Sequence, residues 1–173
     1  GFLIGTILGS AVGLSLWLFP TGAAVLRPYL IALNGLPKIA LAPLIIVWFG
    51  IGISSKIAIG AIITFIVSVI TALQGAKEVD SDLVKLMRSL GAGRWKTWRT
   101  VIIPGSMPWI VAAFRLNVGF ALIGAVVGEY LASKEGLGYM IYYSVVLVVL
   151  NAVWVGIAAL SAVALLMYGT IDL

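Results

Sequence analysis

The protein has 173 residues, of which 62% are hydrophobic and only 10% are charged. Because a soluble domain carries about 25% charged residues, this composition excludes an ordinary soluble globular domain. The net charge at pH 7 is +5, and the sequence contains neither Cys nor His. Disulfide bonds, thiolate metal sites, haem ligation through His and His-based acid–base catalysis are therefore excluded for this chain.

Long uncharged runs mark the parts of the chain that can cross a membrane. Residues 1–26, 57–76 and 136–171 carry no charged side chain, and one helical crossing needs roughly 20 apolar residues. Transmembrane strands would alternate apolar and polar residues, whereas these runs are apolar on every side. The sequence therefore predicts an all-α, polytopic membrane protein with about five transmembrane helices in a single domain, residues 1–173. The predicted helices cover residues 1–19, 29–49, 57–74, 108–128 and 152–169.

The first predicted helix has a face of small residues at four-residue spacing, formed by Gly1, Gly5, Gly9 and Gly13. Such a face lets a second helix approach closely, because lipid provides no hydrophobic force between helices. We expect Pro20–Gly22 to end this helix and Arg27–Pro28 to begin the next segment. No charged leader precedes the helix, so it is not interpreted as a signal peptide, and the chain is expected to be an interior portion of a longer protein.

The second predicted helix contains two sites that interrupt a regular helix. The stretch Asn34–Lys38 includes Pro37, and Pro43 follows it. Proline removes a backbone donor and kinks or breaks a helix. Irregular backbone at membrane depth is tolerated only against protein or a water-filled cavity. Asn34, Pro37 and Pro43 are therefore candidate residues of a pathway wall.

The distribution of Lys and Arg predicts which side of the membrane each loop faces. More than half of the basic residues lie between Lys77 and Arg99, inside the predicted loop 75–107. Cytoplasmic loops are enriched in Lys and Arg, so we expect this loop to be cytoplasmic. Counting helices places Arg27 on the same side, and it places Lys56, Lys134 and a short, partly inserted helix at 139–149 on the outer side. The net positive charge then reflects topology and contact with anionic lipid head groups, and nucleic-acid binding is not indicated.

The charged loop is predicted to contain a short amphipathic helix, residues 81–90. Asp80 is placed to cap its start, Asp82 adds negative charge to its first turn, and Gly91 lies just past its end. Its apolar residues recur at i, i+3, i+4 and i+7, which is one face of a helix. These residues are Leu83, Leu86, Met87 and Leu90.

A second amphipathic piece follows, with Trp95 and Trp98 as apolar anchors. Pro104 and Pro108 then restart the chain toward the membrane, and Pro108 suits the first turn of the next helix. Taken alone, these residues are also typical of a positive-inside loop whose apolar face and tryptophans rest at the membrane interface.

Four polar residues lie within the predicted apolar helices or at their ends. A charge at membrane depth costs about 3 kcal/mol, so Arg115 either meets an anionic substrate or extends to the cytoplasmic head groups. Interhelical hydrogen bonding is the expected role of Asn117 and Asn151. Glu129 lies near the predicted outer boundary of the membrane. It could serve as part of an outer gate or simply occupy an interfacial position.

Several motifs occur in order along most of the chain. Leu41–Gly52 is similar to P-L-x-x-x-W-F-G-x-G, and Arg88–Trp95 to R-S-L-G-A-x-R-W. Ile103–Pro108 is similar to L-P-x-x-x-P, Gly128–Leu131 to A-E and Gly136–Tyr139 to G-L-G-Y. Gly91 with Val101–Pro104 matches a glycine followed by an I-x-L-P tail. Together these motifs resemble binding-protein-dependent ABC transporter permeases of the nitrate/sulfonate/taurine-type branch, in which that glycine and tail belong to the cytoplasmic "EAA" loop.

One departure from the family concerns this loop. Where the family has Glu-Ala-Ala, the sequence has Lys85-Leu86-Met87, so a contact made by that glutamate cannot be transferred to this chain. We interpret the difference as a variant docking surface. The expected ATPase-coupling residues are Leu83, Lys85, Leu86, Met87, Arg88, Leu90, Gly91, Ala92, Arg94 and Pro104. The candidate translocation-path residues are Asn34, Pro37, Pro43, Arg115, Asn117 and Glu129.

The resemblance implies a type I importer permease in the bacterial inner membrane. Such a subunit forms the path for a small solute, an anion or a vitamin precursor, together with a second, usually identical, permease chain. Its implied partners are two cytoplasmic ATPase subunits and an extracytoplasmic binding protein, which Glu129 with Lys134 or Glu135 would contact. The chain is not expected to be an enzyme or to hold a cofactor. It has no G-x-x-x-x-G-K-[ST] phosphate loop, so ATP and Mg²⁺ would bind the partner ATPase.

Three other classes of protein fit the sequence less well. A membrane-embedded enzyme would need converging catalytic groups, and the sequence has no H-E-x-x-H, no G-x-S-x-G and no intramembrane aspartate pair. A secondary transporter driven by an ion gradient would favour acidic residues in mid-membrane. A structural membrane subunit would leave the proline-interrupted segment and the charged helix without a role.

Overall fold

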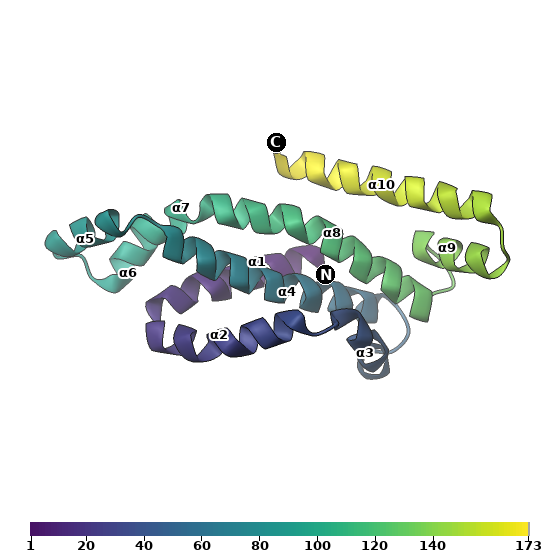
Figure 1. The fold of residues 1–173 in the computed structure, drawn as a ribbon, viewed down its shortest axis with the longest axis horizontal. Coiled ribbons are helices and arrows are strands. Elements are labelled where there is room, and N and C mark those ends of the chain that lie inside the picture. Colours follow the sequence, from purple (N-terminus) through teal and green to yellow (C-terminus); the bar gives the residue numbers. More distant parts are fainter. Residues whose placement is uncertain (173) are drawn as a thin grey trace. The chain divides into compact units, whose positions relative to one another are not determined.

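The computed structural model of the protein describes residues 1–172, and its regular elements over that range are all helices (Figure 1). The predicted all-α fold class is therefore confirmed. Three helices are long and apolar enough to cross a membrane: α4 (Ile53–Glu78), α8 (Met107–Ala132) and α10 (Leu150–Asp172). The interrupted pair Pro20–Gly35 and Lys38–Phe49 provides a further candidate span, and the apolar stretch Phe2–Leu18 is shorter.

The second helix begins nearer the N-terminus than predicted. α1 (Phe2–Ser15) continues into the 3₁₀ turn η1 (Leu16–Leu18), and α2 then runs from Pro20 to Gly35. The first helical stretch ends just before Pro20, so the predicted break at Pro20–Gly22 is confirmed. Pro20 itself begins α2 and Pro28 lies inside it, so the prediction that Arg27–Pro28 begins the next segment is wrong. Pro20 can begin α2 because the first turn of a helix tolerates proline: a backbone N–H at that position would have no intrahelical acceptor in any case.

The predicted break at residues 34–38 is confirmed, but the predicted interruption at Pro43 is wrong. α2 ends at Gly35, its C-cap Leu36 has an extended backbone with ψ 139°, and Pro37 follows. The 3₁₀ turn η2 (Lys38–Leu41) then leads directly into α3 (Ala42–Phe49). Pro43 lies in the first turn of α3, a position that favours the start of a helix.

The remaining helices lie where the sequence placed them, with longer bounds. α4, α8 and α10 each extend past both predicted ends, so the charged segment begins after Glu78 and not at residue 75. This segment contains four short elements: α5 (Ser81–Ser89), α6 (Arg94–Thr97), the π-helical turn η3 (Trp98–Ile102) and α7 (Ile103–Gly105). α9 (Leu137–Val146) corresponds to the short helix predicted at 139–149.

The chain divides into two compact units, and one of them consists of Ile4–Leu36 and Phe65–Phe114. Within this unit α1 packs against α4 through the predicted small-residue face. A Cβ atom at Gly9 would lie 2.7 Å from Cβ of Ser68, and one at Gly13 would lie 2.9 Å from Cβ of Ala72. Such contacts leave no room for a side chain, so glycine sets the helix spacing. The buried core here is formed by Leu14, Ala72, Ala76 and Ile102.

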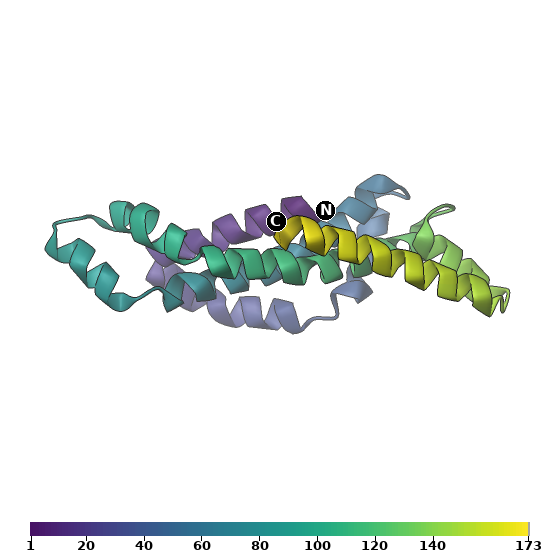
Figure 2. The same cartoon turned by 90° about the horizontal axis from the view of Figure 1, so that it is seen from above.

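The other unit consists of residues 1–3, 37–64 and the chain from Arg115 onward. α4 and α8 approach closely in it, because a Cβ atom at Gly124 would lie 3.2 Å from Cα of Gly60. α9 packs against α10, as the two views agree (Figures 1 and 2). The core of this unit is formed by Ala42, Ile45, Ile59 and Ile63.

Candidate functional site

The helix predicted at 81–90 is present as α5, and the sequence signals at its two ends act as expected. The carboxylate of Asp80 accepts a 2.8 Å hydrogen bond from the backbone N–H of Asp82, which caps the N-terminus. At the C-terminus, the N–H of Gly91 donates to the carbonyl of Arg88, and the N–H of Ala92 donates to the carbonyl of Met87. This pair of bonds is a Schellman motif. Gly91 has the positive φ of 73° that the motif requires.

One face of α5 presents an apolar ridge to its surroundings. Leu83, Leu86 and Leu90 are 47%, 54% and 73% exposed, and we call these three residues the α5 ridge. Met87, predicted on the same face, is half-buried, and Val84 packs against the core of its unit. Lys85 forms an exposed ion pair with Asp82, with Nζ and Oδ1 2.8 Å apart. Exposed pairs of this kind contribute little to stability, so the helix depends on its caps and on Val84.

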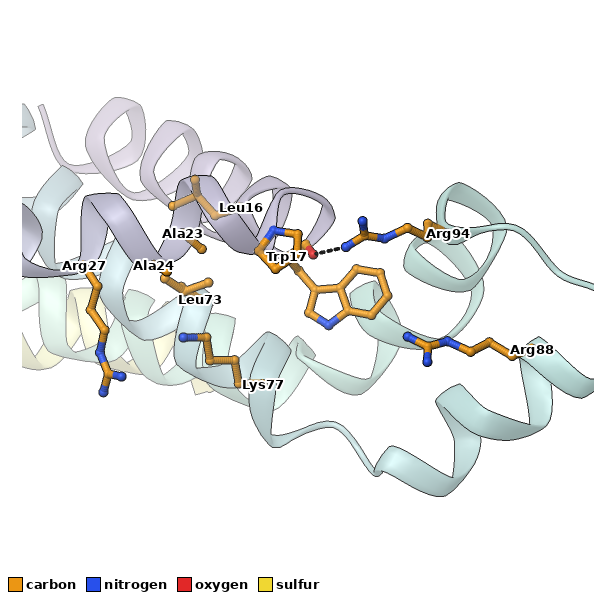
Figure 3. A pocket seen from close by; sticks show the side chains of 10 residues that line it. Leu16, Trp17, Ala23, Ala24, Arg27, Leu73, Lys77, Arg88 and Arg94 are labelled. Atoms are coloured by element: carbon orange, nitrogen blue, oxygen red, sulfur yellow. Dashed lines mark hydrogen bonds between the residues drawn. The ribbon is translucent and has the colours of Figure 1, made fainter.

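The segment that follows α5 is attached to α1 by Trp98 and to η1 by Arg94. Trp95 and Trp98 stack with their ring centroids 4.8 Å apart, and Nε1 of Trp98 donates a 2.8 Å hydrogen bond to the carbonyl oxygen of Leu14. The guanidinium of Arg94 donates to the carbonyl oxygen of Trp17 at 3.5 Å and lies 6.0 Å from the centroid of its ring (Figure 3). The predicted anchors therefore hold protein contacts, although Trp95 remains 61% exposed.

The other predicted coupling residues lie at the end of α5 and in the chain that leads from α5 to α8. Ala92 is half-buried, while Arg88 and Arg94 are exposed. Pro104 lies in the first turn of α7. Pro108 occupies the first turn of α8, as predicted. The structure thus places the coupling residues in one continuous segment that begins with α5.

The candidate translocation-path residues are not gathered at one point. Asn34 is exposed on α2, and Pro37 and Pro43 are exposed at η2 and α3. Arg115 is exposed and Asn117 is buried on α8. Residues two apart on a helix do not share a face, and Asn117 donates through Nδ2 to the carbonyl oxygen of Thr64 at 3.3 Å. This bond from α8 to α4 is the interhelical role predicted for Asn117. Asn151 is exposed near the start of α10.

Glu129 belongs to a polar cluster that the sequence did not identify as a unit. Its Oε1 lies 3.9 Å from Nζ of Lys56, which also donates a 2.9 Å hydrogen bond to Oγ of Ser133. Its Oε2 accepts a 2.7 Å hydrogen bond from the N–H of Gly138, in the first turn of α9. We call Lys56, Glu129, Ser133 and Gly138 the Glu129 cluster. Lys134 and Glu135, the other residues predicted to contact a binding protein, are exposed.

The apolar spans and the exposed, capped helix α5 define the protein as a multi-pass membrane protein with an amphipathic helix outside its spans. The whole chain, residues 1–173, matches the family of binding-protein-dependent transport system inner membrane components, and the protein belongs to that family. The predicted resemblance to ABC permeases of the taurine and sulfonate branch is therefore confirmed.

Three curated relatives illustrate this family. The chain is 35% identical over 143 residues to the riboflavin transport system permease protein RibX of Chloroflexus aurantiacus, covering 83% of this chain and 53% of RibX. It is 32% identical over 161 residues to the taurine transport system permease protein TauC of Escherichia coli, covering 93% and 58% of the two chains. The putative aliphatic sulfonates transport permease protein SsuC of Bacillus subtilis is 34% identical over 163 residues, covering 94% and 59%. The chain thus spans little more than half the length of these relatives.

A solved structure of the MetNI methionine ABC transporter, in an inward-facing conformation, has a similar fold. The TM-score is 0.64 at 17% sequence identity, and the match covers 96% of this chain and 88% of that chain. This similarity confirms the type I importer permease fold.

Proposed function

We propose that the protein is the permease subunit of an ATP-driven importer and that α5 is its coupling helix. Together with a second permease chain, expected to be identical, it forms the path for a small solute that an extracytoplasmic binding protein delivers. Two ATPase subunits bind ATP and Mg²⁺ and supply the hydrolysis, so this chain itself is not catalytic. The relatives suggest an organic anion such as a sulfonate, or a vitamin or vitamin precursor, as the solute.

The α5 ridge is the observation that carries this proposal. Three large apolar side chains are exposed on a helix whose caps fix its ends. An amphipathic helix that lays its apolar face in a groove of a partner is a common mode of protein recognition. Arg88 and Lys85 flank the ridge and would set register and specificity through charge complementarity more than affinity. The replacement of Glu-Ala-Ala by Lys85-Leu86-Met87 would then give this permease its own ATPase specificity.

The contacts behind α5 suggest how its movement reaches the membrane helices. α5 leads through Gly91 into α6 and η3, and Trp98 and Arg94 hold this segment to α1 and η1. If closure of the ATPases on ATP shifts α5, these contacts transmit the displacement to α1. ATP binding can shift the equilibrium only by its different affinity for the inward-facing and outward-facing states.

The sidedness of the protein follows from the same proposal. The segment 77–99 would face the cytoplasm, as the positive-inside rule favours, and the Glu129 cluster would face the outer side. The cluster fastens the start of α9 to α8 and α4, and Lys134 and Glu135 beside it would be available to the binding protein.

The experiment that tests this proposal reconstitutes the full-length permease with its ATPase and measures both ATPase binding and binding-protein-stimulated ATP hydrolysis. Leu86→Asp places a charge in the α5 ridge and should reduce ATPase binding at least about tenfold, because it buries an unpaired charge in the groove. Thr100→Asp introduces the same charge at an exposed position outside α5 and should leave binding unchanged. Equal ATPase binding by wild type and Leu86→Asp, with both proteins folded, would overturn the proposal.

A further inference from the structure

A pocket of about 530 Å³ lies in the unit that contains α5, and four basic side chains line it (Figure 3). They come from four helices: Arg27 from α2, Lys77 from α4, Arg88 from α5 and Arg94 from α6. No carboxylate is among the described residues of its wall. The remainder of the lining is apolar or aromatic and consists of Leu16, Trp17, Pro20, Ala23, Ala24 and Leu73.

None of the four cations has a partner of opposite charge among the described side chains. Among the side chains that the structure describes, none forms an ion pair with Arg27, Lys77 or Arg88. Arg94 bonds only to a neutral group, the carbonyl oxygen of Trp17, and Figure 3 shows Arg88 and Arg94 both extending toward Trp17. Like charges around one pocket repel each other, so an anion in the pocket would remove this repulsion and satisfy several donors at once.

An apolar groove continues from the pocket along α2 and α4. A second cavity of about 140 Å³ shares Arg27, Leu73 and Lys77 with the first. Beyond these shared residues it is lined mainly by apolar side chains, namely Leu30, Ile31 and Ile70, with Gln74 beside them. A cationic pocket that opens into an apolar groove has the polarity of a phospholipid, with a charged head joined to a hydrocarbon tail.

We propose that this composite site binds an anionic phospholipid. Its phosphate would lie among Arg27, Lys77, Arg88 and Arg94, where arginine can donate two parallel hydrogen bonds to phosphate oxygens. One acyl chain would follow Leu30, Ile31 and Ile70. A soluble phosphate has the same headgroup chemistry, but it would leave the apolar groove empty, and for this reason the lipid is favoured.

The position of the site gives the bound lipid a consequence for transport. Arg88 belongs to α5 and Arg94 to α6, whereas Arg27 and Lys77 belong to the long helices α2 and α4. A headgroup bound by all four would link α5 and α6 to the long helices α2 and α4 in one arrangement. The anionic lipid content of the bilayer would then regulate the activity of the transporter, which goes beyond the coupling role proposed for the α5 ridge.

The test is lipid binding by the full-length permease in detergent, measured by native mass spectrometry with phosphatidylglycerol and phosphatidylcholine. We expect the wild type to prefer phosphatidylglycerol and Arg27→Gln/Lys77→Gln to bind it roughly 30-fold less tightly, since each basic residue near a lipid surface strengthens binding about fivefold. The matched control is Lys96→Gln/Arg99→Gln, which removes the same charge at exposed positions outside the pocket. It should retain the preference.

Two further measurements separate the lipid from other anions. Inorganic phosphate at millimolar concentration should fail to displace phosphatidylglycerol. Ile31→Ser should weaken the binding of phosphatidylglycerol and leave the binding of inorganic phosphate unchanged. The proposal is wrong if phosphate competes fully, if both lipids bind equally, or if the two double variants lose binding to the same extent. It is also wrong if Arg27→Gln/Lys77→Gln binds lipid normally and instead loses the ATPase, because the pocket would then receive acidic side chains of a protein partner.

Discussion

Nε1 of Trp98 donates a 2.8 Å hydrogen bond to the carbonyl oxygen of Leu14, and this bond joins the turn after α6 to the last turn of α1. Trp98 also packs against the core of its unit, whose residues Leu14 and Ile102 are buried. The segment that follows the proposed coupling helix is thus attached to α1 by both packing and a directed hydrogen bond.

Replacement of Trp98 by Phe should weaken coupling while α5 remains able to dock. The variant keeps an aromatic ring but loses the indole donor, and a net hydrogen bond contributes about 1 kcal/mol. We expect a lower melting temperature and less transport per ATP hydrolysed, with unchanged affinity for the ATPase. Trp95→Phe is the matched control, because Trp95 is 61% exposed. If transport per ATP does not change in Trp98→Phe, the attachment does not transmit motion.

The Schellman motif after α5 predicts a difference between two neighbouring glycines. Gly91 has φ 73°, whereas Gly93 has φ −68°, and a Cβ atom would meet no neighbour at either position. Gly91→Ala should therefore destabilise the end of α5 by about 1 kcal/mol through backbone strain alone. Gly93→Ala should be neutral. Hydrogen exchange of the α5 amides measures the difference, and equal exchange in the two variants would contradict the assigned role of Gly91.

The features of α5 were predictable from sequence because its determinants are local. Asp80 and Gly91 act on backbone groups within a few residues, and the apolar period fixes which face carries Leu83, Leu86 and Leu90. The break near Pro37 was predictable for the same reason. At these positions the conformation that the neighbouring residues favour is also the one found in the folded protein.

The start of α2 and the long-range polar contacts were not predictable in this way. A proline ends a helix in one context and begins one in another, and Pro20 begins α2 because the chain turns at Phe19. The partners of Glu129 lie on α4 and α9, so the cluster depends on helix packing. The predicted topology put Arg27 and the loop cations on one side of the membrane. That they line one pocket could be seen only in the three-dimensional structure.

The close packing of α1 on α4 predicts that Gly9 tolerates no side chain. A Cβ atom there would lie 2.5 Å from the carbonyl oxygen of Phe65. This oxygen belongs to the backbone of α4, so it can make room only if α1 and α4 move apart. Gly9→Ala should lower stability by about 1–3 kcal/mol through overpacking. Gly22→Ala on α2 is the control, since its Cβ atom would meet Phe19 at an ordinary 3.6 Å. Thermal unfolding in detergent should show a loss for Gly9→Ala alone.

The Glu129 cluster predicts a graded response to substitution at one position. Glu129→Gln removes the charge facing Lys56 but keeps an oxygen that can accept from the N–H of Gly138. Because the two side chains are 23% and 20% exposed, screening limits the loss to about 0.5–1 kcal/mol. Glu129→Ala also leaves the first turn of α9 without its acceptor and should lose about 2 kcal/mol more. Glu135→Gln is the exposed control and should leave the stability unchanged.

Unfolding measured at low and high salt should show that the stability of Glu129→Gln depends less on salt than that of the wild type. Equal losses of stability in Glu129→Gln and Glu129→Ala would mean that the hydrogen bond to Gly138 does not hold α9.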